Sequence, residues 1–129
     1  MEQARRQARP RETGQASSWF PPTVGSVYMA NTLVFNNGDH ADTRPVVVVR
    51  SPQHRLDYVV FLQRTSTCFH LPGVDHAPDS ALGLERPGKW IFAYQRTVRA
   101  DEFEDHRFEC KGELDADFLP RLLGEWEAQ

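Results

Sequence analysis

The chain has 129 residues and a formal net charge of −3, a size that suits one domain with one hydrophobic core and is too small for two. Hydrophobic residues make up 40% of the sequence, which is enough for a packed core, and the small net charge excludes a partner selected by bulk charge alone. No apolar run approaches the roughly 20 residues of a membrane span, and the N-terminus lacks the apolar core of a signal peptide. We therefore expect a cytoplasmic protein with no membrane partner, in which Cys68 and Cys110 are free thiols.

The first 18 residues differ in composition from the rest of the chain. They are rich in Arg, Gln and Ser and hold almost no apolar side chains, so burial cannot offset the entropy lost on ordering them. Residues 1–18 are predicted to be a flexible basic arm, which either contacts nucleic acid or only increases solubility. Residues 19–129 are predicted to form the single folded domain.

From Val24 onward, short apolar runs alternate with turn residues, a pattern typical of an all-β domain. The run PVVVV at residues 45–49 shows no polar alternation, which predicts a strand buried on both faces. Pro45 is expected at the first position of that strand, where its missing N–H does no harm. Strands are predicted near residues 26–34, 45–50, 57–64, 90–95 and 106–111.

The last third of the chain combines a long loop with a helix. Residues 70–88 contain three prolines and three glycines, which predicts irregular backbone with at most one helical turn. Near the C-terminus, apolar residues recur with the spacing of an amphipathic helix, capped by Asp115 or Asp117. Pro120 fits its first turn. The fold class is therefore mainly β, a small antiparallel barrel closed by a C-terminal α-helix.

The order of motifs along residues 24–127 resembles that of a known family. The motifs are VGSVYMA, TRPVVVV, a strand ending in QRTST, LGLERPGKWIFAYQRTV and the tail KGELDADFLPRLLGEW. In this order they resemble the MazF/PemK/Kid family, the plasmid-maintenance toxins of type II toxin–antitoxin systems. The resemblance implies a strongly bent, SH3-like antiparallel barrel of the MazF/CcdB type with a C-terminal helix. It also implies a homodimer, a protein antitoxin as partner, and cleavage of single-stranded RNA without a metal or other cofactor.

Arg44 is the first candidate catalytic residue. When a 2′-hydroxyl attacks the adjacent phosphorus of RNA, negative charge builds up on the non-bridging oxygens, and a fixed arginine stabilises that charge. The seam between a polar loop and a buried strand would hold Arg44 in place before substrate binds. The competing interpretation is that Arg44 caps the strand end or pairs with Asp42.

The resemblance adds a second catalytic candidate and two residues that bind substrate. Thr65 matches the family position that hydrogen-bonds the scissile phosphate, and Ser66 lies beside it; the alternative is ordinary turn composition at a strand end. His40 lies in a loop where some relatives carry a histidine that contacts substrate, and its pKa range suits proton transfer. The alternative for His40 is an exposed side chain without a role. No metal site is expected, because the spacing of Cys68, His70, Asp75 and His76 matches no standard ligand pattern.

One departure from the family concerns the strand before the second QRT segment. Several relatives carry an Arg and an Asp there for proton transfer, whereas this chain has Phe92 and Tyr94. Strand alternation puts Arg96 on the same face as these two, so Tyr94 and Arg96 are further candidates for substrate binding. Two functions therefore remain open: a metal-independent endoribonuclease toxin, or a non-catalytic barrel of the same fold. The latter would be a gyrase-poison relative or a module that binds protein or nucleic acid through the aromatic pair.

Overall fold

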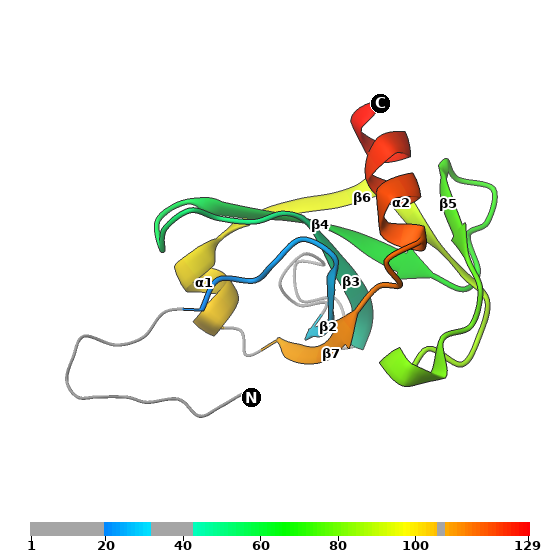
Figure 1. Cartoon of the computed structure of the whole chain (residues 1–129), viewed down its shortest axis with the longest axis horizontal. Helices are drawn as coiled ribbons and strands as arrows, with labels where there is room; N and C mark the ends of the chain where they lie inside the picture. Colours follow the sequence, from blue (N-terminus) through cyan, green and yellow to red (C-terminus); the bar gives the residue numbers. More distant parts are fainter. Residues whose placement is uncertain (1–19, 32–42, 106–107) are drawn as a thin grey trace.

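The computed structural model describes residues 20–31, 43–105 and 108–129, so the expected arm at residues 1–18 lies outside the described residues. The described chain forms one antiparallel sheet in the order β5-β6-β4-β3-β2-β7, with two α-helices (Figure 1). A short 3₁₀ turn, η2, spans Ser80–Leu82. The strands are β2 (Ser26–Asn31), β3 (Thr43–Arg50), β4 (Tyr58–Thr65), β5 (Gly73–His76), β6 (Gly88–Arg99) and β7 (Glu109–Glu113). The helices are α1 (Ala100–Asp105) and α2 (Phe118–Glu127).

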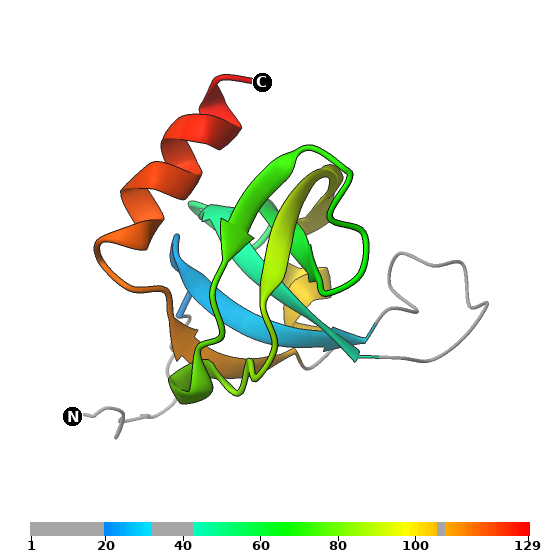
Figure 2. The same cartoon turned by 90° about the vertical axis from the view of Figure 1, so that its right-hand side faces the viewer.

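The sheet curls strongly but stays open (Figure 2). Its curvature is explained by register shifts, because a bulge bends the strand that carries it and increases its twist. The largest shift lies between β4 and β6, where Phe61 pairs with Arg96 but Gln63 pairs with Ile91. Strands β5 and β7 remain edges. The predicted class, mainly β and strongly bent with a C-terminal helix, is confirmed, although the described strands do not close into a barrel.

The core has two parts, one on each face of the sheet. Val47 and Val49 belong to the first cluster, which α2 covers with Phe118, Leu119, Leu123 and Trp126. Val46 and Val48 belong to the second cluster, which includes Phe103 of α1. The prediction that β3 is buried on both faces is therefore confirmed. Pro45 is the third residue of β3 and pairs with Met29, so its predicted place at the first position is wrong by two residues.

Two elements escaped the sequence analysis. Strand β5 lies within the predicted loop at residues 70–88, where it pairs with the start of β6. Helix α1 follows β6 directly, in a stretch for which no element was predicted. Strand β6 is also longer than expected, because pairing with both β4 and β5 supports its length.

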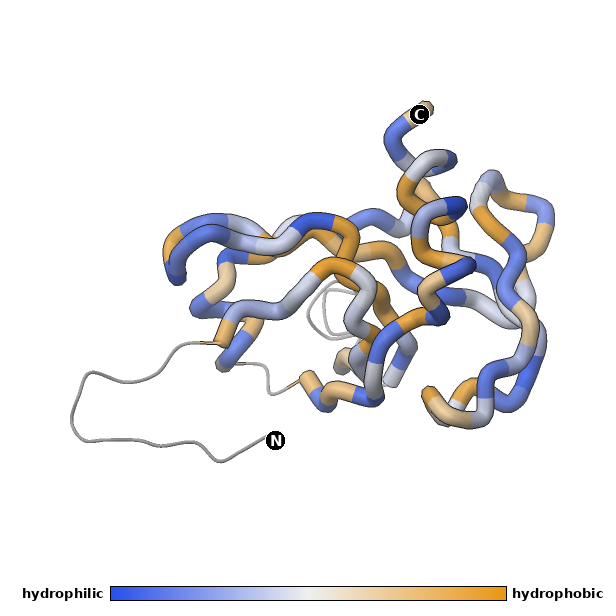
Figure 3. Tube along the Cα trace, in the orientation of Figure 1, coloured by the Kyte–Doolittle hydropathy of each residue, from blue (hydrophilic) through white to orange (hydrophobic). Residues whose placement is uncertain are grey.

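The C-terminal helix is close to the prediction. Helix α2 begins at Phe118, and Pro120 lies in its first turn. Asp117 occupies the N-cap position without a capping hydrogen bond from its side chain, while the Asp115 carboxylate accepts the N–H of Asp117. Figure 3 shows hydrophobic and hydrophilic residues alternating along α2, as an amphipathic helix requires. Within the described ranges, no helix is long and apolar enough to cross a membrane.

Candidate functional site

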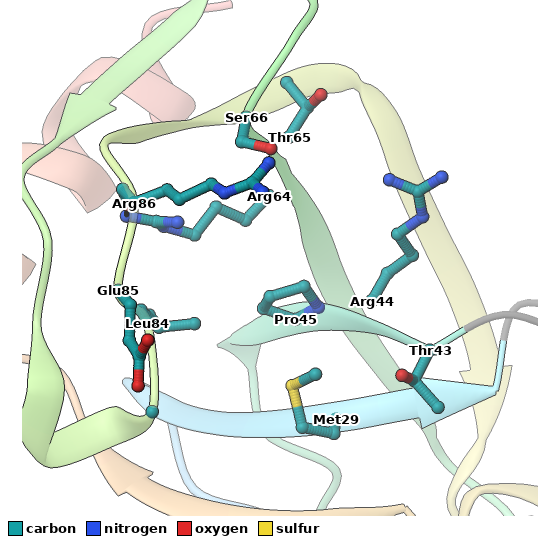
Figure 4. Close-up of a pocket in the computed structure, with 11 residues that line it drawn as sticks. Met29, Thr43, Arg44, Pro45, Arg64, Thr65, Ser66, Leu84, Glu85 and Arg86 are labelled. Atoms are coloured by element: carbon teal, nitrogen blue, oxygen red, sulfur yellow. Dashed lines mark hydrogen bonds between the residues drawn. The ribbon is translucent and has the colours of Figure 1, made fainter.

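A pocket of about 410 Å³ opens where the β2–β3 ladder meets the end of β4 and the segment after η2. Three of the predicted site residues, Arg44, Thr65 and Ser66, line it (Figure 4). In that view Arg44 and Thr65 lie on one side, Leu84 and Glu85 lie on the other, and Pro45 lies between them. The structure thus brings together residues that are more than 20 positions apart in the sequence. The remaining lining residues are Met29, Thr43, Arg64, Gly83 and Arg86.

Arg44 is the second residue of β3 and pairs with Ala30 on β2. The backbone that follows it is held firmly, because Val46 to Val49 are buried on both faces of the sheet. The side chain itself is only half-buried at the pocket rim. Its charge lowers the pKa of the Tyr94 hydroxyl slightly against other, larger effects that raise it, so the two groups lie within electrostatic reach. The arrangement is a cation on a rigid base, open to the pocket.

Thr65 ends β4 and organises the turn that follows. Its Oγ1 accepts the backbone N–H of Thr67 at 3.2 Å and that of Cys68 at 3.3 Å. The turn role that competed with catalysis is therefore present, and Thr65 lines the pocket as well. Both accepted bonds draw electron density from the hydroxyl, which makes its own O–H a better donor.

Arg64 is a pocket residue that the sequence analysis missed. Its side chain is only 4% exposed, and burial lowers the pKa of the guanidinium. Nε donates to His76 Nδ1 at 3.0 Å, and Nη2 donates to the carbonyl oxygens of His76, Ala77 and Arg86 at 3.1, 3.3 and 2.9 Å. One side chain thus ties β4 to the end of β5 and to the segment before β6. The available signal was its place in an apolar strand, on the same face as Leu62.

His76 completes this network. Burial, followed by the positive charge of Arg64, lowers its pKa to about 4, while Asp79 acts weakly in the opposite direction. The ring is therefore neutral near pH 7, which it must be for Nδ1 to accept the bond from Arg64. It also packs 4.7 Å from Phe118 of α2 and 5.7 Å from Trp90, measured between ring centroids. Gly88 leaves the space for the guanidinium, since a Cβ there would lie 2.5 Å from Arg64 Cζ.

The predicted face of Phe92, Tyr94 and Arg96 is corrected by the β6 bulge. Between the Phe61–Arg96 and Gln63–Ile91 pairs, β4 has one residue, Leu62, and β6 has four. Side chains along this part of β6 therefore do not simply alternate between the two faces of the sheet. Phe92 packs against the first core cluster, beneath α2, whereas Arg96 pairs with Phe61 of the second cluster. Phe92 and Arg96 therefore do not share a face of the sheet. Neither Tyr94 nor Arg96 lines the pocket.

Tyr94 lies near the rim rather than in the pocket. Its hydroxyl hydrogen-bonds the Cys68 thiol, an interaction that raises the pKa of Tyr94. The pKa of Cys68 is lowered, first by the hydrogen bond with Thr67, then by that with Tyr94, and more weakly by Arg44. Cys68 and Cys110 are both free thiols, as expected. Tyr94 and Cys68 thus form a hydrogen-bonded polar group beside Thr65, and Arg44 lies within electrostatic reach of both.

His40 and Asp42 lie outside the described residues, so the predicted role of His40 and the alternative pairing of Arg44 with Asp42 both stay predictions. The structure places His76 in the Arg64 network instead of in a metal site. Across residues 20–31, 43–105 and 108–129, no group of three or more His, Cys, Asp or Glu side chains is arranged to hold a metal ion.

Comparison with known proteins identifies the architecture. Neither a protein-family model nor a curated protein sequence matches the chain. Among solved structures, MazF (Form-I) from Deinococcus radiodurans is similar with a TM-score of 0.57 and 16% identity, covering 84% of this chain and 96% of that one. Two MazE-MazF crystals from the same organism, Form-III and Form-II, give TM-scores of 0.56 and 0.51 at 17% and 18% identity. These matches cover 84% of this chain and 95% and 94% of those chains. The chain therefore has a MazF-like fold.

Proposed function

We propose that this protein is a MazF-like toxin of a type II toxin–antitoxin system and cleaves single-stranded RNA without a metal ion. The observation that carries the proposal is the convergence of Arg44, Thr65 and Ser66 in one pocket. The MazF-like fold supports it independently of these residues. We propose that the protein acts in the cytoplasm, where RNA is available as a substrate.

In the proposed reaction the 2′-oxygen of one nucleotide forms a bond to the adjacent phosphorus, and the bond from phosphorus to the 5′-oxygen of the next nucleotide breaks. The proton of the 2′-hydroxyl passes to water and the 5′-oxygen takes a proton from water, which leaves a 2′,3′-cyclic phosphate and a 5′-hydroxyl. Arg44 donates to the non-bridging oxygens as their charge increases, and the Thr65 O–H donates to the same group. Because the strand behind Arg44 is fixed by the core, little reorganisation is needed during the reaction.

The pocket offers few groups for proton transfer. The pocket lining contains no histidine, and Glu85 is its one carboxylate among the described residues. Tyr94, at the position where relatives carry an acid, has a raised pKa and is protonated near neutral pH. These observations favour a slow nuclease, and they keep a second candidate function open: a barrel of this fold that binds RNA or protein without cleaving it.

The decisive experiment is incubation of the purified protein with a long RNA in EDTA. Cleavage is expected for the wild type, and Arg44→Ala is expected to lower the rate by about 10²- to 10³-fold, as for the loss of one oxyanion donor. Thr65→Val should lower it as well, although part of that effect reflects the turn. Arg50→Ala is the matched control, because it removes the same charge from the other, exposed end of β3. Intact RNA at high protein concentration would refute the nuclease and favour the binding module.

The proposed partners are an antitoxin protein and a second copy of the chain. Two of the similar structures come from MazE-MazF crystals, which supports a protein antitoxin for this chain too. The homodimer is a proposal from the family resemblance. Light scattering of the purified protein tests it, with a mass near twice 14.8 kDa expected.

A further inference from the structure

The side of the pocket opposite Arg44 carries two charged groups that the proposed cleavage does not use. Glu85 and Arg86 are consecutive, exposed residues, and both line the pocket. In Figure 4 their side chains diverge: Arg86 extends toward the end of β4, where Ser66 lies, and Glu85 points away from it. Within the described part of the chain, neither charged group forms an ion pair. A carboxylate and a guanidinium are thus presented separately to whatever occupies the pocket.

The backbone that carries these two side chains is held in place. Asp79 and Leu84 exchange two backbone hydrogen bonds, with N–O distances of 2.6 and 2.9 Å. Gly83 adopts φ of 72°, a left-handed conformation that closes the turn. Arg64 Nη2 holds the carbonyl of Arg86 at 2.9 Å. The backbone of such a segment is preorganised, so little backbone entropy is lost when a ligand binds.

The wall between the charged groups is apolar. It consists of the side chains of Met29, Pro45 and Leu84, which suits the flat face of a nucleobase. Arg64 adds a further donor group from the buried side. Its hydrogen bonds use Nε and Nη2, and its Nη1 has no acceptor within the described ranges.

We propose that this pocket binds a guanine base of the RNA substrate, beside the phosphate that Arg44 contacts; this rests on the proposed function. Guanine alone presents two adjacent donors, N1–H and N2–H, on its Watson–Crick edge, and these match the two oxygens of Glu85. Its O6 and N7 are both acceptors, which an arginine binds with two parallel hydrogen bonds, and Arg86 supplies that fork.

The other bases fit less well. Adenine and cytosine each offer the carboxylate one donor next to a ring-nitrogen acceptor that it repels, and uracil offers one donor between two acceptors. A second phosphate would be attracted by Arg86 but repelled by Glu85. A role of Glu85 as general base is disfavoured because Figure 4 places it across the pocket from Arg44 and Thr65.

The experiment uses pairs of short RNAs that differ at one nucleotide next to the cleaved bond, guanosine or inosine, with cleavage followed in EDTA. Inosine lacks the 2-amino group and therefore one of the two donors for Glu85. The wild type is expected to cut the guanosine RNA about 5- to 150-fold faster than the inosine RNA. Glu85→Gln should remove most of this ratio, while Glu127→Gln, an exposed carboxylate on α2, should leave it unchanged. An RNA with 7-deazaguanine, which lacks the N7 acceptor, tests the Arg86 contact in the same way. The wild type should cut it more slowly than the guanosine RNA, and Arg86→Ala should remove most of this difference.

Binding of the same RNAs, measured by fluorescence anisotropy, separates this inference from the proposed function. If no RNA is cut but guanosine RNA binds more tightly than inosine RNA and Glu85→Gln removes the difference, the base site stands and the nuclease does not. If RNA is cut and bound with equal efficiency for both bases, the base site is refuted and the nuclease stands. A uniform loss of cleavage at every sequence in Glu85→Gln would also overturn it, because that result indicates a proton-transfer role.

Discussion

Arg44 and Arg64 line the same pocket but differ in how deeply their side chains are buried. Arg64 is buried, and its Nε and Nη2 donate to four acceptors that belong to the protein. Arg44 is half-exposed at the rim, on a strand fixed by the core behind it. The comparison teaches that two arginines of one pocket can differ in role because they differ in burial. Arg64 maintains the shape of the site, and Arg44 is the residue for which we propose contact with the substrate phosphate.

The largest expected difference between the two arginines is in the free energy of unfolding lost when each guanidinium is removed. Arg64→Met leaves three carbonyl oxygens and His76 Nδ1 without their donor, and we expect the free energy of unfolding to fall by about 3 kcal/mol. Arg44→Met removes a half-exposed side chain and should lower it by less than about 1 kcal/mol. Urea unfolding followed by tryptophan fluorescence measures both. Equal losses would mean that Arg44 is structural too, and the comparison would fail.

The Arg64 network also predicts a pH dependence through His76. Its pKa in the folded protein is about 4, below the ordinary value of 6.5, because burial and Arg64 disfavour the charged ring. The unfolded chain therefore takes up the proton first as the pH falls. The contribution of His76 to the free energy of unfolding is therefore complete above about pH 6.5. It decreases as the pH falls from about 6.5 to about 4 and is constant below that, with a total loss of at most about 3 kcal/mol.

Urea unfolding at pH 7, 5.5 and 4 measures this effect, with His76→Gln as the reference. The stability advantage of the wild type over His76→Gln should shrink as the pH decreases. An advantage that is independent of pH would contradict the neutral, buried ring.

A smaller effect is expected where glycine makes room for Arg64. In Gly88→Ala the new Cβ would lie 2.5 Å from Arg64 Cζ, so the guanidinium must shift, with an expected loss of about 1 to 2 kcal/mol. Gly124→Ala is the matched control, because nothing lies within 4 Å of its Cβ position and alanine favours the α2 helix by about 0.5 to 1 kcal/mol. Thermal unfolding should therefore shift in opposite directions for the two variants.

The smallest effect concerns the rim beside Arg44. The pKa of Cys68 is lowered by hydrogen bonds with Thr67 and Tyr94, so a larger fraction of the thiol is reactive thiolate at neutral pH. Thr67→Val and Tyr94→Phe should each slow alkylation of Cys68 by iodoacetamide by about 2- to 3-fold at pH 7.5. Mass spectrometry in a Cys110→Ser background follows Cys68 alone. Unchanged rates would detach Tyr94 from the polar group at the rim.

The sequence by itself determined the elements whose signal is local. Two-sided burial of β3 follows from four consecutive valines, and α2 follows from apolar spacing around Pro120. Arg44, Thr65 and Ser66 were selected by chemistry and by resemblance, and they meet in one pocket.

Only the tertiary structure decided the rest. Strand β5 exists because β6 pairs with it, and four residues with glycine at the start carry no strand signal alone. The β6 bulge separates Phe92 from Arg96, and alternation cannot predict a bulge. The hydrogen bonds of Arg64 join positions 12 to 22 residues apart in the sequence. The bond to the carbonyl of Arg86 holds the segment from which Glu85 and Arg86 line the pocket. Such contacts depend on which strands pair and in what register, so they arise only when the whole sheet forms.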